Sequence, residues 1–213
     1  AHVLPRAAHQ QQPSFWSIIK TPSVIFLCLT YMLYAFVAWI FILWLPTYLV
    51  EGRGLARMEM GKIGMLPTFG GFLGMITGGT VSDWLLRRGF STRVARARFP
   101  GVSIALAVPF LLLGVNAPTT GLSIALLTLF YFTFSLAVSG YWTMPRELAP
   151  QAVGAVGGVM NTTGNFAGLF GPTIAGFIIQ ETGSWIMLFY MAAGIALVSS
   201  AVFTFLVRTE PIE

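Results

Sequence analysis

The side chains that could carry chemistry in this sequence are polar rather than charged, and they recur at helical spacing. Asn161 and Asn165 are four residues apart, which places two amides on one face of a helix. A second series with the spacing of one helical face contains Tyr131, Ser135, Ser139 and Trp142. In an apolar helix such groups must find a hydrogen-bonding partner or line water. They can therefore bind a ligand or join neighbouring helices, and the spacing leaves both roles open.

The elements that hold these side chains follow from the distribution of charge. Only 9% of the 213 residues are charged, against roughly 25% in an average soluble protein. About 20 apolar residues in a helix cross the roughly 30 Å hydrocarbon core of a membrane. The charge-free stretches are residues 21–50, 63–82, 99–145, 148–180 and 182–207. The third is long enough for two helices, because the turn formers of residues 116–121 interrupt it.

The sequence therefore predicts an all-α membrane protein with six transmembrane helices within residues 21–213. The expected spans are residues 23–50, 63–81, 99–115, 121–144, 152–179 and 184–207. Strands of a membrane barrel would instead alternate apolar and polar residues over about ten positions. Residues 1–20 contain no apolar core and are expected to form a cytoplasmic linker.

Positive charge distinguishes the two sides of the membrane. Nine of the twelve Lys and Arg residues lie in the terminal segments and in the second and fourth loops, and three lie in the other loops. The positive-inside rule then places both termini in the cytoplasm. Arginines at the ends of spans can also attract anionic lipid head groups, and this explanation is favoured over binding of nucleic acid.

The absence of charge and of histidine from the six spans excludes most catalytic chemistry. Acid–base catalysis, metal binding and nucleophilic catalysis need a carboxylate, an imidazole or an activated thiol. Cys28 has no histidine near it in the sequence, since both histidines precede residue 10. We therefore expect no enzyme activity, no metal and no cofactor. The chain begins with Ala1, so we expect a processed product or a piece of something longer.

Glycines recur every fourth residue in two of the expected spans. These glycines are Gly70, Gly74 and Gly78 in the second span, and Gly154 with Gly158 and Gly164 with Gly168 in the fifth. Glycine at this spacing lets helix backbones approach closely in lipid. Plain helix packing is the expected role, and the same geometry would also allow the faces to slide or hinge in a conformational cycle.

A charged motif follows the second span. Gly79, Asp83 and Arg87 are spaced four residues apart, and Arg88 comes next. Glycine allows a close approach, Asp83 can pair with Arg87 one turn away or accept hydrogen bonds from a helix N-terminus, and the arginines remain among the head groups.

This G-x-x-x-D-x-x-x-R pattern resembles the loop signature between the second and third helices of each six-helix half of the major facilitator superfamily. Residues 41–49, with the W-x-P-x-Y-L ending, look like the seventh helix of its anion:cation symporter family. Residues 157–172 look like the eleventh helix of that family, and Trp142 with residues 145–150 looks like the end of its tenth.

The resemblance implies the C-terminal half of a twelve-helix carrier in a bacterial inner membrane. Such carriers move small organic anions, such as sugar acids or aromatic carboxylates, by alternating access, usually with protons or sodium as the coupling ion. The expected partners are therefore the substrate anion, the coupling ion, the N-terminal six-helix half and the lipid bilayer. Members of the family bind anions and protons largely through charged residues of the N-terminal half.

The resemblance also assigns candidate site residues. Trp142 and Asn161 correspond to substrate contacts in related carriers, while face position adds Tyr141, Ser139, Asn165 and Tyr34. The cytoplasmic gate would contain Gly79, Asp83, Arg87 and Arg88. The alternative is a stand-alone six-span protein that acts as an interaction subunit or a facilitative pore.

Overall fold

The computed structural model describes residues 15–212, which form helices joined by short turns. The helices are α1 (Phe15–Ile19), α2 (Pro22–Thr47), α3 (Arg57–Ile63), α4 (Met65–Arg87), α5 (Phe99–Val115), α6 (Thr120–Ser135), α7 (Val138–Leu148), α8 (Val153–Thr182) and α9 (Trp185–Ala201). Wider, π-helical turns at Tyr48–Gly52, Val94–Arg98 and Val202–Leu206 adjoin three of them. The all-α prediction is thus confirmed for the described residues.

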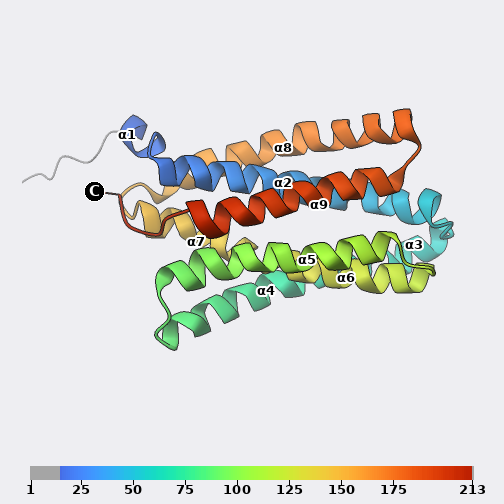
Figure 1. Cartoon of the computed structure of the whole chain (residues 1–213), viewed down its shortest axis with the longest axis horizontal. Coiled ribbons are helices and arrows are strands. Elements are labelled where there is room, and N and C mark those ends of the chain that lie inside the picture. The colour runs from blue at the N-terminus through green and yellow to red at the C-terminus, as the bar shows by residue number, and fades with distance from the viewer. Residues whose placement is uncertain (1–14, 213) are drawn as a thin grey trace, which may run out of the picture.

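The long helices run side by side in two layers (Figure 1). In one layer α2 packs between α8 and α9, and in the other α6 packs between α4 and α5. Contacts between α5 and α9 join the layers. Helix α1, the turn from α4 to α5 and the C-terminus all lie at one end of the bundle, whereas α3 lies at the other.

Four helical segments of the described residues are long and apolar enough to cross a membrane. They are Pro22–Gly52, Val94–Val115, Thr120–Leu148 and Trp185–Leu206. Helices α4 and α8 contain 23 and 30 residues, but their many glycines and threonines lower their mean hydropathy. The six-span topology therefore stays a prediction, and residues 1–14 of the expected linker lie outside the described residues.

Glycine brings the backbones of α4 and α6 together. A Cβ atom at Gly74 would collide with the carbonyl oxygen of Phe132, and one at Gly78 with that of Leu136. On α8, Gly164 lies against the ring of Tyr31 in α2. Packing accounts for these glycines, since no side chain would fit there.

The N-terminal part of α8 differs, because its glycines face open space. Apart from the adjacent residues and the nearby backbone of α8 itself, no described atom lies within 4 Å of a Cβ built at Gly154, Gly157 or Gly158. The packing predicted for Gly154 and Gly158 therefore has no partner among residues 15–212.

Arg53 joins the end of α2 to the turn between α5 and α6. Its guanidinium donates to the carbonyl oxygens of Ala117 (2.7 Å), Gly114 (2.9 Å) and Val115 (3.1 Å), and its Nε donates to the Tyr48 hydroxyl (2.7 Å). The last carbonyls of a helix have no partner inside the helix, and they carry partial negative charge. Arg53 therefore caps the C-terminus of α5 from the turn that follows α2 and Tyr48–Gly52.

Replacing Gly74 by Ala tests the close approach of α4 and α6. We expect Gly74→Ala to lower the free energy of unfolding by about 1–3 kcal/mol, because the added methyl group meets the backbone of α6. The matched control is Gly157→Ala, where open space leaves only the gain of up to about 1 kcal/mol in helix propensity. Unfolding in detergent measures both, and equal stabilities would contradict the packing.

Arg53→Ala tests the cap on α5. Loss of its charged hydrogen bonds should lower the free energy of unfolding by about 1.5–3 kcal/mol. Arg57→Ala is the control, because Arg57 is exposed and its loss should cost less than about 0.5 kcal/mol. If thermal unfolding of the two variants were the same, the cap would contribute nothing to stability.

Candidate functional site

Trp142, Asn161 and Asn165 lie on the open surface of α7 and α8. The Trp142 side chain is 52% exposed, and both asparagines are exposed. The Asn165 amide donates to the carbonyl oxygen of Asn161 (2.9 Å), which lies one turn earlier in the same helix. Asn161 and Asn165 therefore form a polar patch along one exposed edge of α8.

Tyr31 of α2 connects these two helices. Its ring lies edge-on to Trp142 with 6.2 Å between the ring centroids, and it also covers Gly164, next to Asn165. Tyr31 thus contacts both Trp142 of α7 and Gly164 of α8, and the shared binding site of Trp142, Asn161 and Asn165 stays a prediction. The indole face and the amides could together bind a ligand that has both an apolar surface and hydrogen-bonding groups.

Tyr141 does not reach that surface, and its predicted role in binding stays a prediction. It is fully buried, and its hydroxyl lies 3.0 Å from the hydroxyl of Thr30 and 3.2 Å from that of Ser199. A buried hydroxyl needs such partners, and α2 and α9 supply them. The Tyr141 ring also packs against Tyr31, with 5.1 Å between the ring centroids.

Tyr34 is also buried, with only 6% of its surface exposed. Its ring stacks on Phe134 of α6 at a centroid distance of 4.3 Å. It also packs against Tyr141 at 4.9 Å. Tyr34 therefore belongs to the aromatic core beneath the exposed residues rather than to the surface itself.

Ser139 and Trp142 both lie in α7, and a break in the helix separates them from Tyr131 and Ser135 in α6. The predicted single face over Tyr131, Ser135, Ser139 and Trp142 assumes one continuous helix, but α6 ends at Ser135 and α7 begins at Val138. The Leu136 carbonyl within the break accepts a hydrogen bond from the Ser139 hydroxyl (3.3 Å) and lies against Gly78. Ser139 consequently faces α4, where its Cβ would lie 3.9 Å from a Cβ at Gly79.

Asp83 pairs with Arg96 rather than with Arg87. Arg96 Nη2 lies 2.7 Å from the Asp83 carboxylate, and Nη1 donates to Ser82 Oγ (3.0 Å). Side chains of Arg87 and Arg88 are exposed, whereas Arg96 retains only 12% exposure. The less exposed partner is favoured because surface ion pairs at i, i+4 are screened by water.

Arg96 also approaches a third helix. Its Nε lies 3.9 Å from the Glu147 carboxylate of α7, a separation that allows charge attraction but not a hydrogen bond. One guanidinium thereby links the ends of α4, α5 and α7. Sequence reasoning missed Arg96, although the fully buried residues Ala95 and Ala97 on either side indicate that this segment packs inward.

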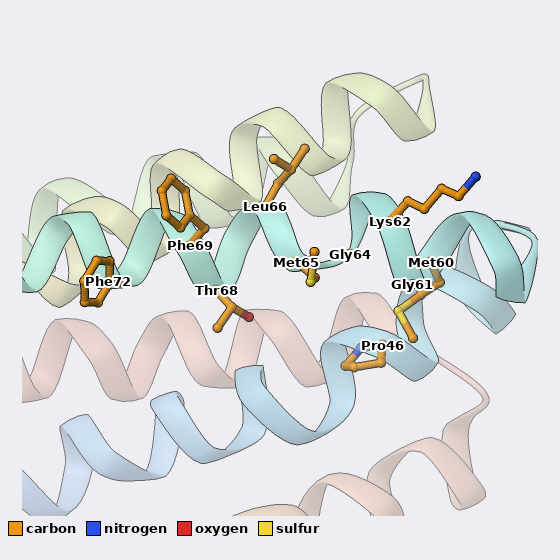
Figure 2. A pocket seen from close by; sticks show the side chains of 10 residues that line it. All are labelled: Pro46, Met60, Gly61, Lys62, Gly64, Met65, Leu66, Thr68, Phe69 and Phe72. Carbon is orange, nitrogen blue, oxygen red and sulfur yellow. The ribbon is translucent and has the colours of Figure 1, made fainter.

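The cavities of the described residues lie elsewhere. One of about 640 Å³ opens between the end of α2, α3 and the first turns of α4 (Figure 2). Its lining is mostly apolar, and Lys62 extends outward at one end. A second apolar cavity of similar volume lies between α2, α8 and α9. None of the predicted site residues lines either cavity.

Comparisons with known proteins identify a family and several similar proteins. A family model described as Major Facilitator Superfamily matches residues 2–172. The chain is 32% identical to the "Hexuronate transporter" of Bacillus subtilis (strain 168), over 85% of this chain and 44% of that protein. It is 33% identical to the "Probable galactarate/D-glucarate transporter GarP" of Escherichia coli (strain K12), over 70% of this chain and 33% of that protein.

A third relative is named for a different substrate, a sulfonate. The "Probable sulfoacetate transporter SauU" of Cupriavidus necator is 30% identical over 76% of this chain and 38% of its own length. The chain therefore spans less than half the length of these curated relatives. The comparisons confirm the resemblance stated from the sequence, and the relatives are transporters by name.

Arg96→Gln tests the link between the three helix ends. Without the guanidinium, Asp83 and Glu147 lose their shared cation, so we expect a loss of about 1–3 kcal/mol in the free energy of unfolding. The control is Arg98→Gln, an exposed arginine two residues later in the same π-helical turn. Denaturant titration in detergent compares them, and an unfolding midpoint for Arg96→Gln no lower than that of the control would refute the link.

Proposed function

This chain belongs to the Major Facilitator Superfamily, and on that basis we propose that it is the C-terminal six-helix half of a carrier for small organic anions. The named substrates of its relatives include hexuronate, galactarate with D-glucarate, and sulfoacetate. Each of these named substrates is a small polar molecule that carries an acidic group. The fraction of each relative that the chain covers supports a half-carrier, which a second set of helices completes.

The observation that carries this proposal is the exposed polar edge formed by Trp142, Asn161 and Asn165. Asparagine amides are costly in hydrocarbon unless they have partners or line water. We therefore place the second half, and the substrate between the halves, against this edge. Trp142 would cover an apolar face of the substrate, and the two amides would bind its hydroxyl or carboxylate oxygens.

The two less apolar helices support the same arrangement. At about 1.5 Å per residue, α4 and α8 are roughly 35 and 45 Å long, which is enough to cross a membrane. A helix that faces a polar cavity or another protein half needs less hydrophobicity than one that faces lipid. We propose that α4 and α8 complete the six spans, with both termini in the cytoplasm of a bacterial cell.

We assign coupling and gating to different parts of the carrier. The predicted spans of this chain contain no Asp, Glu, Lys, Arg or His, so the residues that bind the proton or sodium ion belong to the other half. Alternating access would require the cytoplasmic ends of the helices to separate and close. The ion pair of Asp83 with Arg96, and the packing of α4 near Gly79 beside Ser139, would hold one of these states, while Arg87 and Arg88 remain in the head groups.

Uptake of a labelled hexuronate into proteoliposomes tests the proposed function. The chain together with a matching N-terminal six-helix half should transport the anion, and the chain alone should not. Asn161→Ala and Trp142→Ala should each weaken the apparent affinity by about tenfold, the equivalent of one lost hydrogen bond or stacking contact. Asn116→Ala and Trp16→Ala are the controls, because both are exposed amide or indole residues outside the proposed site.

Two results would decide against this proposal. Uptake by the chain alone, unchanged by the second half, would favour the stand-alone pore. Unchanged affinity in both Asn161→Ala and Trp142→Ala, with folded protein in each case, would remove the exposed edge from the substrate site.

A further inference from the structure

The turn between α4 and α5 concentrates positive charge that has no acidic neighbour in the sequence. Arg87, Arg88, Arg93 and Arg98 are all exposed. No Asp or Glu lies between Asp83 and Glu147 in the sequence, and Asp83 is already held by Arg96. Arg93 donates to the carbonyl oxygen of Phe205 (3.4 Å), so the guanidinium groups of Arg87, Arg88 and Arg98 remain available to an external anion.

The local backbone fixes two of these arginines at the end of α4. Gly89 adopts a positive φ of 85°, and the Phe90 N–H donates to the carbonyl oxygen of Leu85 (3.1 Å). This pairing is the Schellman ending of a helix, which needs glycine at the left-handed position. Arg87 and Arg88 thus stand beside the negative end of the helix dipole, where cations are stabilised.

The exposed indole of Trp84 indicates how deep this turn lies in the membrane. Trp84 is 46% exposed, and the Arg88 guanidinium carbon lies 5.0 Å from the centroid of its ring. Tryptophan prefers the boundary between head groups and hydrocarbon. An arginine stacked on its face is therefore held at the level of the lipid phosphates.

An apolar stripe runs from the turn along the outer face of α5. Arg98, Val102, Leu106 and Leu113 are spaced by four, four and seven residues, which keeps them on one helical face. The three apolar side chains are 46%, 59% and 59% exposed. A cation at one end of an exposed apolar stripe matches the two parts of a phospholipid.

We propose that this surface is a binding site for one anionic phospholipid of the cytoplasmic leaflet. The guanidinium groups of Arg87, Arg88 and Arg98 bind the phosphate, with which arginine forms paired hydrogen bonds. An acyl chain lies along Val102 and Leu106. A zwitterionic lipid binds less well, because its own ammonium group opposes the arginines. The inference concerns a different surface from the proposed substrate site and does not depend on transport.

The test compares lipid retention by the whole chain in nanodiscs of phosphatidylcholine that contain increasing phosphatidylglycerol. Native mass spectrometry then counts the phosphatidylglycerol molecules that remain bound. Each arginine near a membrane surface contributes about fivefold in affinity, so the triple variant Arg87→Gln/Arg88→Gln/Arg98→Gln should bind at least about tenfold more weakly. Arg57→Gln/Lys62→Gln should bind as the original chain does, because these exposed cations lie near α3 at the other end of the bundle.

A second measurement needs no change to the arginines. Brominated phosphatidylglycerol should quench the emission of Trp84, taken as the difference between the original chain and Trp84→Phe, more strongly than brominated phosphatidylcholine. Equal quenching by the two lipids would overturn the proposal. So would full lipid retention by the folded triple variant, or binding of glycerol 1-phosphate as tight as that of phosphatidylglycerol, since the apolar stripe would then have no role.

Discussion

The fold depends on the close approach of helix backbones at glycine. Burial of apolar surface cannot drive helices together inside lipid, where the solvent is as apolar as the side chains. Contact between α4 and α6 therefore relies on the short distance that Gly74 and Gly78 allow. The backbone of α4 packs directly against α6, and this fixes the position of the C-terminal end of α4. Ser82 and Asp83 at that end can therefore contact Arg96.

Charged residues within residues 15–212 are confined to the ends of the long helices, to the shorter helices α3 and α7 and to the turns, and this determines what they can do. Arg53 caps a helix at one end of the bundle, and Arg96 joins three helices at the other. Both connect elements far apart in sequence without placing a charge in the middle of the bundle. Polar contacts in the interior are instead made by hydroxyl groups, as in the cluster of Thr30, Tyr141 and Ser199.

Helices could be predicted from the sequence because charge and turn residues mark their ends. The third expected span, residues 99–115, has the bounds of α5. Contacts between helices were harder to predict from the sequence. The break after Ser135 has no proline or glycine to indicate it, and it separates Tyr131 and Ser135 from Ser139 and Trp142. Periodicity could place Tyr141 on a helix, but its burial depends on α2 and α9, whose positions no local pattern specifies. Asp83 likewise has its partner thirteen residues away rather than one turn away.

The π-helical turn at Val94–Arg98 makes the position of Arg96 depend on the number of residues in that turn. A π-helical turn contains about one residue more than an α-helical turn. Deletion of one residue there would restore regular α-helix, and it would rotate everything before the deletion by about 100° relative to α5. The extra residue of the π-helical turn thus sets the direction of Arg96 relative to α5. Arg96 can point toward Asp83 while the face of α5 that contacts α9 keeps its direction. The contact between Arg96 and Asp83 consequently depends on the length of this segment as well as on its residue types.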